Sequence, residues 1–300
     1  STRDWLDPFV RGLNDYQQQL RRRPPEFRWL GLRMEPWSVL DVLSLGRLAG
    51  ADVNWSSQLG LLRARGAGGS TGQDLGQIWQ RLRIAGGTAL AGRVGQLAAQ
   101  LTRGGSNSVA IAASRSASGA PLMANDPHLG QQLPNFWVLA GVHCPGYRMV
   151  GLMPAGLPFV GVGAGPSFAW GGTNMRAASS DLVDVSALDP GLIHAQTVSI
   201  KVRGLGRRSR RIRRTPYGPI LNDARVLRVR GGAVALRWQG SEPSDEIGAF
   251  LAAARAQDVP AFREAFADFG VCAQNILFAS RDGHIGHVYA AHLPRRRDWP

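Results

Sequence analysis

The local sequence pattern changes at residue 106, and this change limits the possible folds more than any other feature of the chain. The residues before it are mostly of helical type. After it come short apolar segments divided by Gly and Pro, a pattern that predicts strands. The predicted strands are 107–113, 119–124, 136–143, 147–152, 167–174, 198–203, 226–230 and 233–239. Strands gathered between helical segments predict an α+β fold.

The segment 1–66 is predicted to be mostly helical. Ser38, followed three residues later by Asp41, is typical of the capping box that begins a helix. The apolar positions of the helix that follows include Leu40, Leu43 and Leu48.

Helical patterns return near the end of the sequence, at 247–256 and 260–269. Beyond them, the segments 276–280 and 285–290 lie on either side of an Asp-Gly pair. Apolar segments joined by such a pair predict a β-hairpin. The chain is therefore expected to end in a helical region followed by two paired strands.

The net charge of +14 raises the question of a nucleic-acid partner. Much of it comes from the arginine clusters 21–23, 207–214 and 295–297, and Lys201 is the only lysine. No zinc-finger spacing, RNP-like aromatic motif or heptad zipper accompanies the charge. We therefore interpret the clusters as solvated surface. An Arg-rich module that binds nucleic acid or anionic surfaces through 207–214 is the alternative.

Length and composition allow a sizeable hydrophobic core, because hydrophobic residues make up 44% of the 300 positions. Gly and Pro interrupt the apolar stretches, as in 150–164, and none approaches the length of a membrane span. Cys144 and Cys272 are the two cysteines. They are compatible with one disulfide or with two free thiols.

Ser106 follows a Gly-Gly pair and opens the sequence Ser-Asn-Ser-Val-Ala-Ile-Ala. A short Gly-Gly-Ser-Asn segment is by itself typical of a linker turn. A serine hydroxyl is a weak nucleophile at neutral pH and needs a neighbouring base. An α-amine titrates near pH 8, at about the right value for that task. A serine that is also a chain terminus therefore holds nucleophile and base in one residue.

The segments 104–112 and 122–129 together resemble the self-processing junction of the penicillin acylase family of N-terminal-nucleophile amidohydrolases. The second segment is Leu-Met-Ala-Asn-Asp-Pro-His-Leu. The resemblance implies autoproteolysis between Gly105 and Ser106, which would make Ser106 the catalytic N-terminus. It also implies that His128 orients the serine hydroxyl and relays protons. Without that context, a lone His is more often a merely hydrogen-bonded side chain.

Two further segments resemble the family's oxyanion-stabilising groups. Residues 168–174, Phe-Ala-Trp-Gly-Gly-Thr-Asn, match an Ala-Trp-Gly-x-Thr element and imply the backbone N–H of Asn174 as one donor. Alone, this stretch is typical of a buried Trp on a Gly-rich turn. Residues 274–286 match an Asn ahead of a hairpin and imply the side chain of Asn275 as the second donor. The Pro-x-Arg that follows implies that Arg296 positions active-site groups.

The sequence Asp-Leu-Val-Asp at 181–184 resembles an element that binds calcium in the family. The resemblance implies Asp181, Val183 and Asp184 as ligands of a structural ion, and it implies no cofactor for catalysis. Gln58 stands where the family usually offers a Glu ligand, and a neutral ligand weakens a calcium site. The alternative is a strand end with solvated carboxylates.

Two other features match nothing functional in the family. The glycine-rich run 161–165 lacks the context of a nucleotide-binding loop and corresponds to a loop in the resemblance. His284, His287 and His292 suggest a metal site by composition. They fall on the predicted hairpin, where the family has no such site, and we interpret them as incidental.

The resemblance extends along nearly all of the chain and implies its organisation. It assigns 1–66 to the C-terminal part of a small chain, 67–105 to an excised spacer and 106–300 to the N-terminal part of a large chain. An amphipathic helical hairpin of the core is the alternative for the spacer. The implied fold is a four-layer αββα sandwich, incomplete in this chain because the family extends beyond both ends. We therefore expect a fragment or a truncated form.

The function implied by the resemblance is hydrolysis of a small-molecule acyl amide by a heterodimer cut from one precursor. The substrate classes in the family are β-lactam antibiotics, acyl-homoserine lactones and related amides. The resemblance also implies a periplasmic or secreted location, with no membrane span and no nucleic-acid partner. The alternatives are the Arg-rich binding module and a catalytically inactive, truncated relative.

Overall fold

The computed structural model describes residues 1–51, 106–128, 135–175, 177–224, 229 and 232–296. Its helices are α1 (Thr2–Gln19), α2 (Pro25–Trp29), α3 (Val39–Gly50), α7 (Glu246–Ala253) and α8 (Val259–Glu264). Its strands are β1 (Ser106–Ile111), β2 (Leu122–Pro127), β3 (Trp137–Cys144), β4 (Tyr147–Pro154), β5 (Val162–Ala164), β6 (Phe168–Asn174), β7 (Ser180–Asp184), β8 (His194–Val202), β9 (Gly206–Thr215), β10 (Gly218–Pro219), β11 (Val234–Trp238), β12 (Gln274–Ser280) and β13 (Ile285–Ala290).

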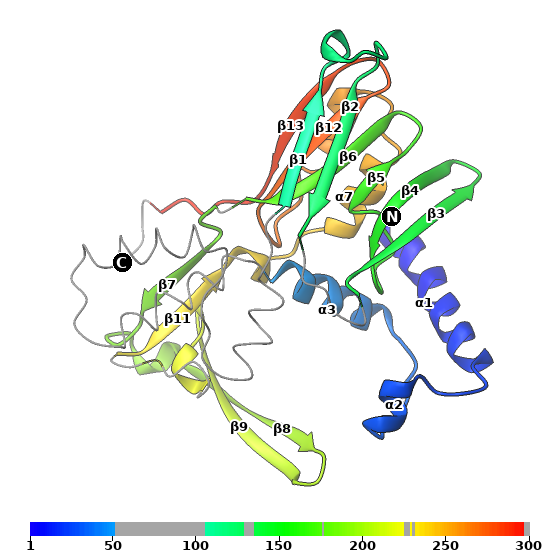
Figure 1. Ribbon diagram of the computed structural model, residues 1–300. Coiled ribbons are helices and arrows are strands. Elements are labelled where there is room, and N and C mark those ends of the chain that lie inside the picture. The colour runs from blue at the N-terminus through cyan, green and yellow to red at the C-terminus, as the bar shows by residue number, and fades with distance from the viewer. Residues whose placement is uncertain (52–105, 129–134, 176, 225–228, 230–231, 297–300) are drawn as a thin grey trace.

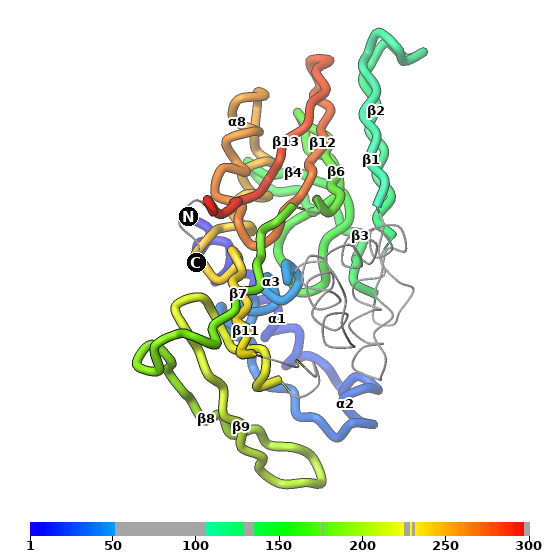
Figure 2. Tube along the Cα trace, turned by 90° about the vertical axis from the view of Figure 1, so that its left-hand side faces the viewer, coloured from blue at the N-terminus to red at the C-terminus, as the bar shows by residue number. Residues whose placement is uncertain are grey.

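The main sheet has six antiparallel strands in the order β13-β12-β6-β5-β4-β3. The hairpin β1–β2 lies across one face of this sheet, over β6 and β12 (Figure 1). The helices α7 and α8 cover the other face. Figure 2 shows these layers edge-on, with helix, sheet and β1–β2 hairpin following one another across the molecule.

The core lies between the main sheet and the helices, and side-chain alternation along the strands explains its position. Trp170 of β6 and Ile276 of β12 are each 1% exposed and point to the helical side. The ring of Phe262 in α8 lies 4.7 Å from that of Phe168 and 4.9 Å from that of Phe278. The alternate residues of β6 and β12 therefore face the β1–β2 hairpin.

The mixed α and β content confirms the predicted α+β class, and the described elements form one helical layer and two β layers. The outer face of β1–β2 carries Val109, Ile111 and Leu122, which are between 37% and 51% exposed. The described residues therefore do not establish the fourth layer of the expected sandwich.

A smaller β region follows the main sheet in the sequence. β7 pairs with β11, and β8, β9 and β10 form a second antiparallel group. The hairpin β8–β9 extends from the smaller β region toward the side of α2 (Figures 1 and 2), and the side chain of Arg203 at its turn lies against Gly31. It contains the arginine cluster 207–214, whose residues are mostly exposed, as expected for solvated surface.

Most predicted elements are confirmed, with boundaries shifted by a few residues. The predicted strand 226–230 and the spacer 67–105 lie outside the described residues, apart from position 229. The glycine-rich segment 161–165 was expected to be a loop, and it contains strand β5 instead. The reason is close packing: a Cβ at Gly163 would lie 2.2 Å from the carbonyl oxygen of Val150 on β4, so only Gly permits this pairing.

The capping box at the start of α3 is confirmed, because Asp41 Oδ2 accepts from the backbone N–H of Ser38 at 2.7 Å. The expected apolar face is wrong. Leu40, Leu43 and Leu48 are 70%, 42% and 68% exposed, whereas Val42 is fully buried.

The buried side of α3 is its small-residue side. Gly46 and Gly50 lie four positions apart and follow Val42 on the same side of the helix. A Cβ at Gly50 would lie only 2.6 Å from Val271, so this side is the one that allows the helix to approach the core closely.

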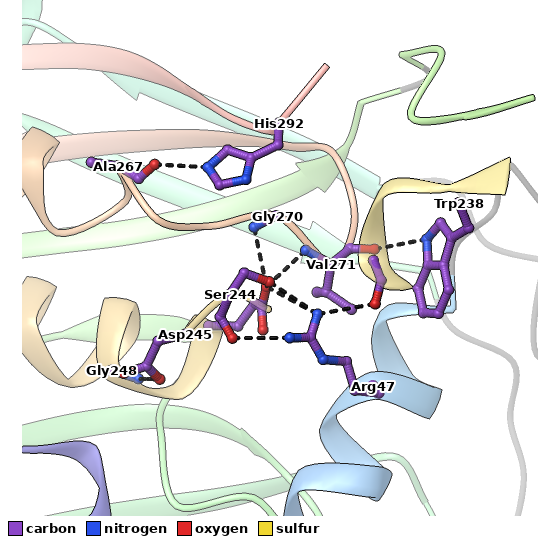
Figure 3. A network of polar contacts seen from close by, with 11 residues as sticks. Arg47, Trp238, Ser244, Asp245, Gly248, Ala267, Gly270, Val271 and His292 are labelled. Atoms are coloured by element: carbon purple, nitrogen blue, oxygen red, sulfur yellow. Dashed lines mark hydrogen bonds and ion pairs between the residues drawn. The ribbon is translucent and has the colours of Figure 1, made fainter. Parts of the chain in front are cut away.

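A polar network fastens α3 to the region around α7 (Figure 3). The guanidinium of Arg47 donates to Ser244 Oγ at 2.9 Å and to the Ser244 carbonyl at 3.0 Å. It also lies 3.8 Å from the Glu246 carboxylate, which accepts from the backbone N–H groups of Gly270 and Val271 at 3.1 and 2.7 Å. Residues on the two sides of position 106 are thus held together. Cys144 and Cys272 are free thiols, so the disulfide alternative is excluded.

Candidate active site

Ser106 lies on the inner face of β1, toward the main sheet. β1 pairs with β2 so that Ser106 is opposite Pro127 and Ser108 is opposite Asn125, and these residues share one face of the hairpin. The alternate positions, such as Asn107, point outward and are exposed. A serine side chain at this position faces the space between the two β layers.

Asn125 joins the two layers beside Ser106. Its side-chain NH2 donates to the carbonyl of Asn107 at 3.2 Å and to the carbonyl of Gly172 on β6 at 3.1 Å. A Cβ at Gly171 would lie 2.5 Å from the Cβ of Asn125, so glycine allows β2 to lie directly on β6. β1 itself contacts both β6 and β12, so the strand that begins with Ser106 lies over these two strands.

Asn275 projects from the main sheet into the same space. It is opposite Thr173 in the β12–β6 ladder, and its neighbour Ile276 points to the helical core. The Asn275 Nδ2 donates to Thr173 Oγ1 at 3.2 Å, and its Oδ1 lies 3.1 Å from His287 Nε2. Figure 1 shows β1 beginning near the end of the sheet where β6 ends and β12 begins.

The backbone N–H of Asn174 points away from β12. Met175 N–H donates to the carbonyl of Ala273 at 2.9 Å, and residues along an antiparallel ladder alternate between bonded and non-bonded pairs. The next pair, Asn174 with Gln274, is therefore of the non-bonded type. The Asn174 side chain lies on the helical side, where its Oδ1 accepts from Gln274 Nε2 at 2.5 Å.

His128 follows β2 directly, so its backbone is close to that of Ser106. Its Nε2 lies 2.5 Å from the carboxylate of Asp126, and both side chains are more than half exposed. Asp126 is on the outer face of β2, opposite the face that carries Ser106. The structure therefore places the two backbones together but directs this imidazole to the outer side.

Arg296 lies at the far end of the chain segment that leaves β13. Its guanidinium donates to both carboxylate oxygens of Asp181, at 3.3 and 3.0 Å, and to the carbonyl of Ala178. The ion pair is partly buried, with Asp181 23% exposed. Arg296 thus fixes the chain leading into β7, and the contact fastens the end of the hairpin to the smaller β region.

The residues of the predicted calcium site lie on β7. Asp181 and Asp184 are three positions apart in a strand, so their side chains point to opposite faces. The Asp181 carboxylate binds Arg296, the Asp184 carboxylate accepts from the N–H of Ser186 at 2.9 Å, and Val183 is buried. In this arrangement the two carboxylates do not point toward one common position.

In the described parts of the chain, no cluster of three or more His, Cys, Asp or Glu side chains is placed to hold a metal ion. Gln58 is outside those parts. Calcium binding therefore stays a prediction from the resemblance.

Sequence reasoning missed the side chains that support Asn275. His287, which the sequence analysis interprets as incidental, contacts the candidate oxyanion donor, because its Nε2 lies 3.1 Å from the Oδ1 of Asn275. His292 instead contacts the carbonyl of Ala267 at 3.0 Å (Figure 3), and His284 uses its backbone N–H on Ser280. The signal for His287 is its spacing: on a hairpin, it is diagonal to Asn275 and on the same face.

Comparisons with known proteins decide the family. A model of the penicillin amidase family matches residues 1–300. The chain belongs to the penicillin amidase family. An acyl-homoserine lactone acylase QuiP of Pseudomonas aeruginosa is 27% identical over 98% of this chain and 40% of its own length. The penicillin acylase 2 proenzyme of Pseudomonas sp. SE83 is 26% identical over 98% of this chain and 42% of its own length.

This penicillin amidase family chain thus spans about two fifths of the curated relatives that it matches. A solved structure, the thermostable penicillin G acylase of Alcaligenes faecalis, matches with a TM-score of 0.54 and 24% identity. The match covers 63% of this chain and 36% of that one, and it supports the fold. Within the described residues, no helix is both long and apolar enough to cross a membrane.

Proposed function

We propose that this chain carries the nucleophile of an acylase that hydrolyses small-molecule acyl amides through Ser106. The observation that carries the proposal is the common orientation of Ser106 and Asn275 toward the space between the two β layers. Acyl transfer needs a nucleophile and a donor for the oxyanion, and a serine hydroxyl and an amide N–H can fill these two roles. The names of the relatives, acyl-homoserine lactone acylase and penicillin acylase, support acyl amides as the substrate class.

The reaction begins with processing. Cleavage of the Gly105–Ser106 bond frees the Ser106 α-amine, which then takes the proton of its own hydroxyl. The hydroxyl oxygen attacks the substrate carbonyl, and the amine leaves with a proton. Water then attacks the acyl-enzyme ester, releasing the acid and restoring Ser106. The name of one relative, a proenzyme, supports the processing step.

Stabilisation of the tetrahedral intermediate is assigned to two donors. These are the backbone N–H of Asn174, which the ladder directs away from β12, and the Nδ2 of Asn275. Asn275 Nδ2 carries two hydrogens, and Thr173 takes one of them. The other is available for an oxyanion. His128, which follows the residue opposite Ser106, and Arg296, which binds Asp181, keep in the proposal the roles that the family resemblance implies.

The organisation of the whole protein is proposed with the activity. Residues 1–66 form the end of a small chain, 67–105 a spacer and 106–300 the start of a large chain. The two chains remain together as a heterodimer in the periplasm or outside the cell. The Arg47 network across the junction supports this association. Further family sequence would supply the fourth layer of the sandwich, over the exposed outer face of β1–β2.

Replacing Asn275 tests the catalytic assignment. Asn275→Ala should lower kcat about 10²–10³-fold, because one preorganised oxyanion donor is worth that much. Asn135→Ala is the matched control, since Asn135 bonds only the N–H of Trp137 among the described contacts and should leave the rate unchanged. The assay is turnover of a chromogenic acyl anilide by the processed full-length protein. Normal turnover by Asn275→Ala would refute the assignment.

A second candidate function rests on the β8–β9 hairpin. Residues 194–215 contain Lys201, Arg203 and the arginine cluster 207–214 but no Asp or Glu, and the hairpin is largely exposed. Such a ribbon has the charge to bind polyanions. Asp223 compensates one of these charges, that of Arg213.

Binding to a labelled single-stranded DNA tests the second candidate. Affinity should fall about 10²-fold between 50 and 200 mM salt, as counterion release requires. It should be lost when Arg207, Arg208, Arg210 and Arg211 are changed to Gln. Absent or salt-insensitive binding would exclude this candidate and leave the cluster as solvated surface.

A further inference from the structure

His287 is the side chain on the final hairpin that contacts the proposed oxyanion donor. Its Nε2 lies 3.1 Å from Asn275 Oδ1, across the β12–β13 ladder. His287 is opposite Leu277, and Leu277 is two residues from Asn275, so all three side chains share one face of the sheet. This is the face toward which Ser106 points.

The imidazole of His287 also contacts the ring of Tyr289. The ring centroid of His287 lies 4.2 Å from that of Tyr289, with an interplanar angle of 55°. Tyr289 is opposite Asn275 in the ladder and is 69% exposed. A neighbouring aromatic ring of this kind limits the rotamers open to an exposed histidine.

The contact between His287 and Asn275 has a donor side and an acceptor side. In the observed orientation the Oδ1 of Asn275 faces His287, and an amide oxygen only accepts, so His287 donates from Nε2–H. The bond keeps Oδ1 of Asn275 toward His287 and therefore keeps Nδ2 toward Thr173. One N–H of Nδ2 binds Thr173 Oγ1, and the second remains for a ligand in the space between the layers.

We propose that His287 is a positioning residue that orients the Asn275 amide for oxyanion stabilisation. The proposal rests on the proposed function. Arg296, the positioning residue that the sequence suggested, has its guanidinium on Asp181 and Ala178. His287, in contrast, contacts the Asn275 amide directly, on the oxygen opposite the Nδ2 that binds Thr173.

Kinetics of His287 variants test the proposal in the processed full-length protein with a chromogenic acyl anilide. His287→Leu should lower kcat about 3- to 10-fold, the equivalent of one ordinary hydrogen bond, with KM changed less than about twofold. His287→Gln keeps an N–H donor and should restore most of the loss. His284→Leu is the matched control, because His284 bonds through its backbone and should leave kcat unchanged.

A double-mutant cycle separates positioning from any other role. In an Asn275→Ala background, His287→Leu should have no further effect on kcat, because the group that it orients is gone. An unchanged kcat in His287→Leu alone would overturn the proposal. So would an equal loss in both backgrounds. If Asn275→Ala itself keeps normal turnover, the oxyanion assignment fails first, and that result is distinct from a failure of His287.

Discussion

At the scale of single residues, the site depends on amide side chains that connect elements distant in sequence. Asn125 bridges the β1–β2 hairpin to β6, and Asn275 bridges β12 to both Thr173 and His287. Each amide offers donors and an acceptor at once, so a single side chain can fix two neighbours. The result is a rigid frame around the space that Ser106 faces.

Asp223 shows how one residue supports the basic hairpin. Burial disfavours its charge, but side-chain and backbone bonds from Arg213 outweigh burial and lower the pKa of Asp223 below its ordinary value of 3.8. A lowered pKa in the folded state means that the charge stabilises the fold above pH 3.8. This stabilisation is lost as the pH falls through the folded-state value.

We therefore expect Asp223→Asn to reduce the free energy of unfolding at pH 7 by about 1 kcal/mol, a figure limited by the partial exposure of Arg213. The difference from the wild type should shrink as the pH falls below 3.8. Urea unfolding at pH 7 and pH 3 measures both values. Arg210→Gln is the control, because the side chain of Arg210 bonds only the adjacent Ser209 carbonyl among the described contacts. A destabilisation that is the same at both pH values would contradict this explanation.

At the scale of elements, α3 is attached to the part of the chain that follows position 106 by close packing and by one arginine. The Gly50 side approaches Val271, and Arg47 enters the Glu246 network in Figure 3. The sequence predicted this helix and its capping box, because both signals are local. It did not predict the buried side, because the leucines were the stronger apolar signal and the close contact with Val271 buries the side of Val42 and Gly50 instead.

Arg47→Met should lower the free energy of unfolding by about 1.5–3 kcal/mol, the range for hydrogen bonds to charged groups. The methionine keeps an aliphatic stem, so the loss reports the guanidinium. The Glu246 carboxylate keeps its bonds from Gly270 and Val271, which limits the cost. Chemical unfolding of the wild type and of Arg47→Met measures this loss of free energy.

Arg3→Met is the matched control for this prediction. Arg3 forms an exposed pair with Asp7 at 3.7 Å, and exposed pairs contribute little. The account of α3 is contradicted if Arg47→Met is no more destabilising than Arg3→Met. In the processed protein, the same variant should also release the small chain more readily.

Other elements could be predicted where the signal is local in the sequence, and were missed where it depends on a neighbouring strand. Gly and Pro punctuation marks the strands of the main sheet, and it does so within a few residues. β5 was missed because its glycines are needed only when β4 lies beside it. β9 was not predicted as a strand, because arginine has a weak preference for strands. Its pairing with β8 becomes visible only in the folded structure.

The candidate site divides in the same way. Motif order was enough to propose Ser106, Asn174 and Asn275. His287 required the hairpin register, which places it diagonally across from Asn275. The orientation of His128 toward Asp126 also depends on which face of β2 each side chain takes.

At the scale of the whole molecule, the layers explain why the site lies where it does. The helices and the main sheet enclose the aromatic core, and the β1–β2 hairpin closes over the opposite face of the sheet. The candidate site therefore lies between two β layers, with Ser106 on one side and Asn275 on the other. The outer face of β1–β2 remains exposed in the described residues, and the chain spans only about two fifths of its curated relatives.

The central claim is that Ser106 becomes an N-terminal nucleophile, and intact mass spectrometry of the purified full-length protein tests it most directly. The wild type should yield a fragment that begins at Ser106, and Ser106→Cys, which keeps a nucleophile, should be cut at the same bond. Ser106→Ala should stay whole. An uncut wild type that is folded by circular dichroism, or cutting that persists in Ser106→Ala, would contradict the claim.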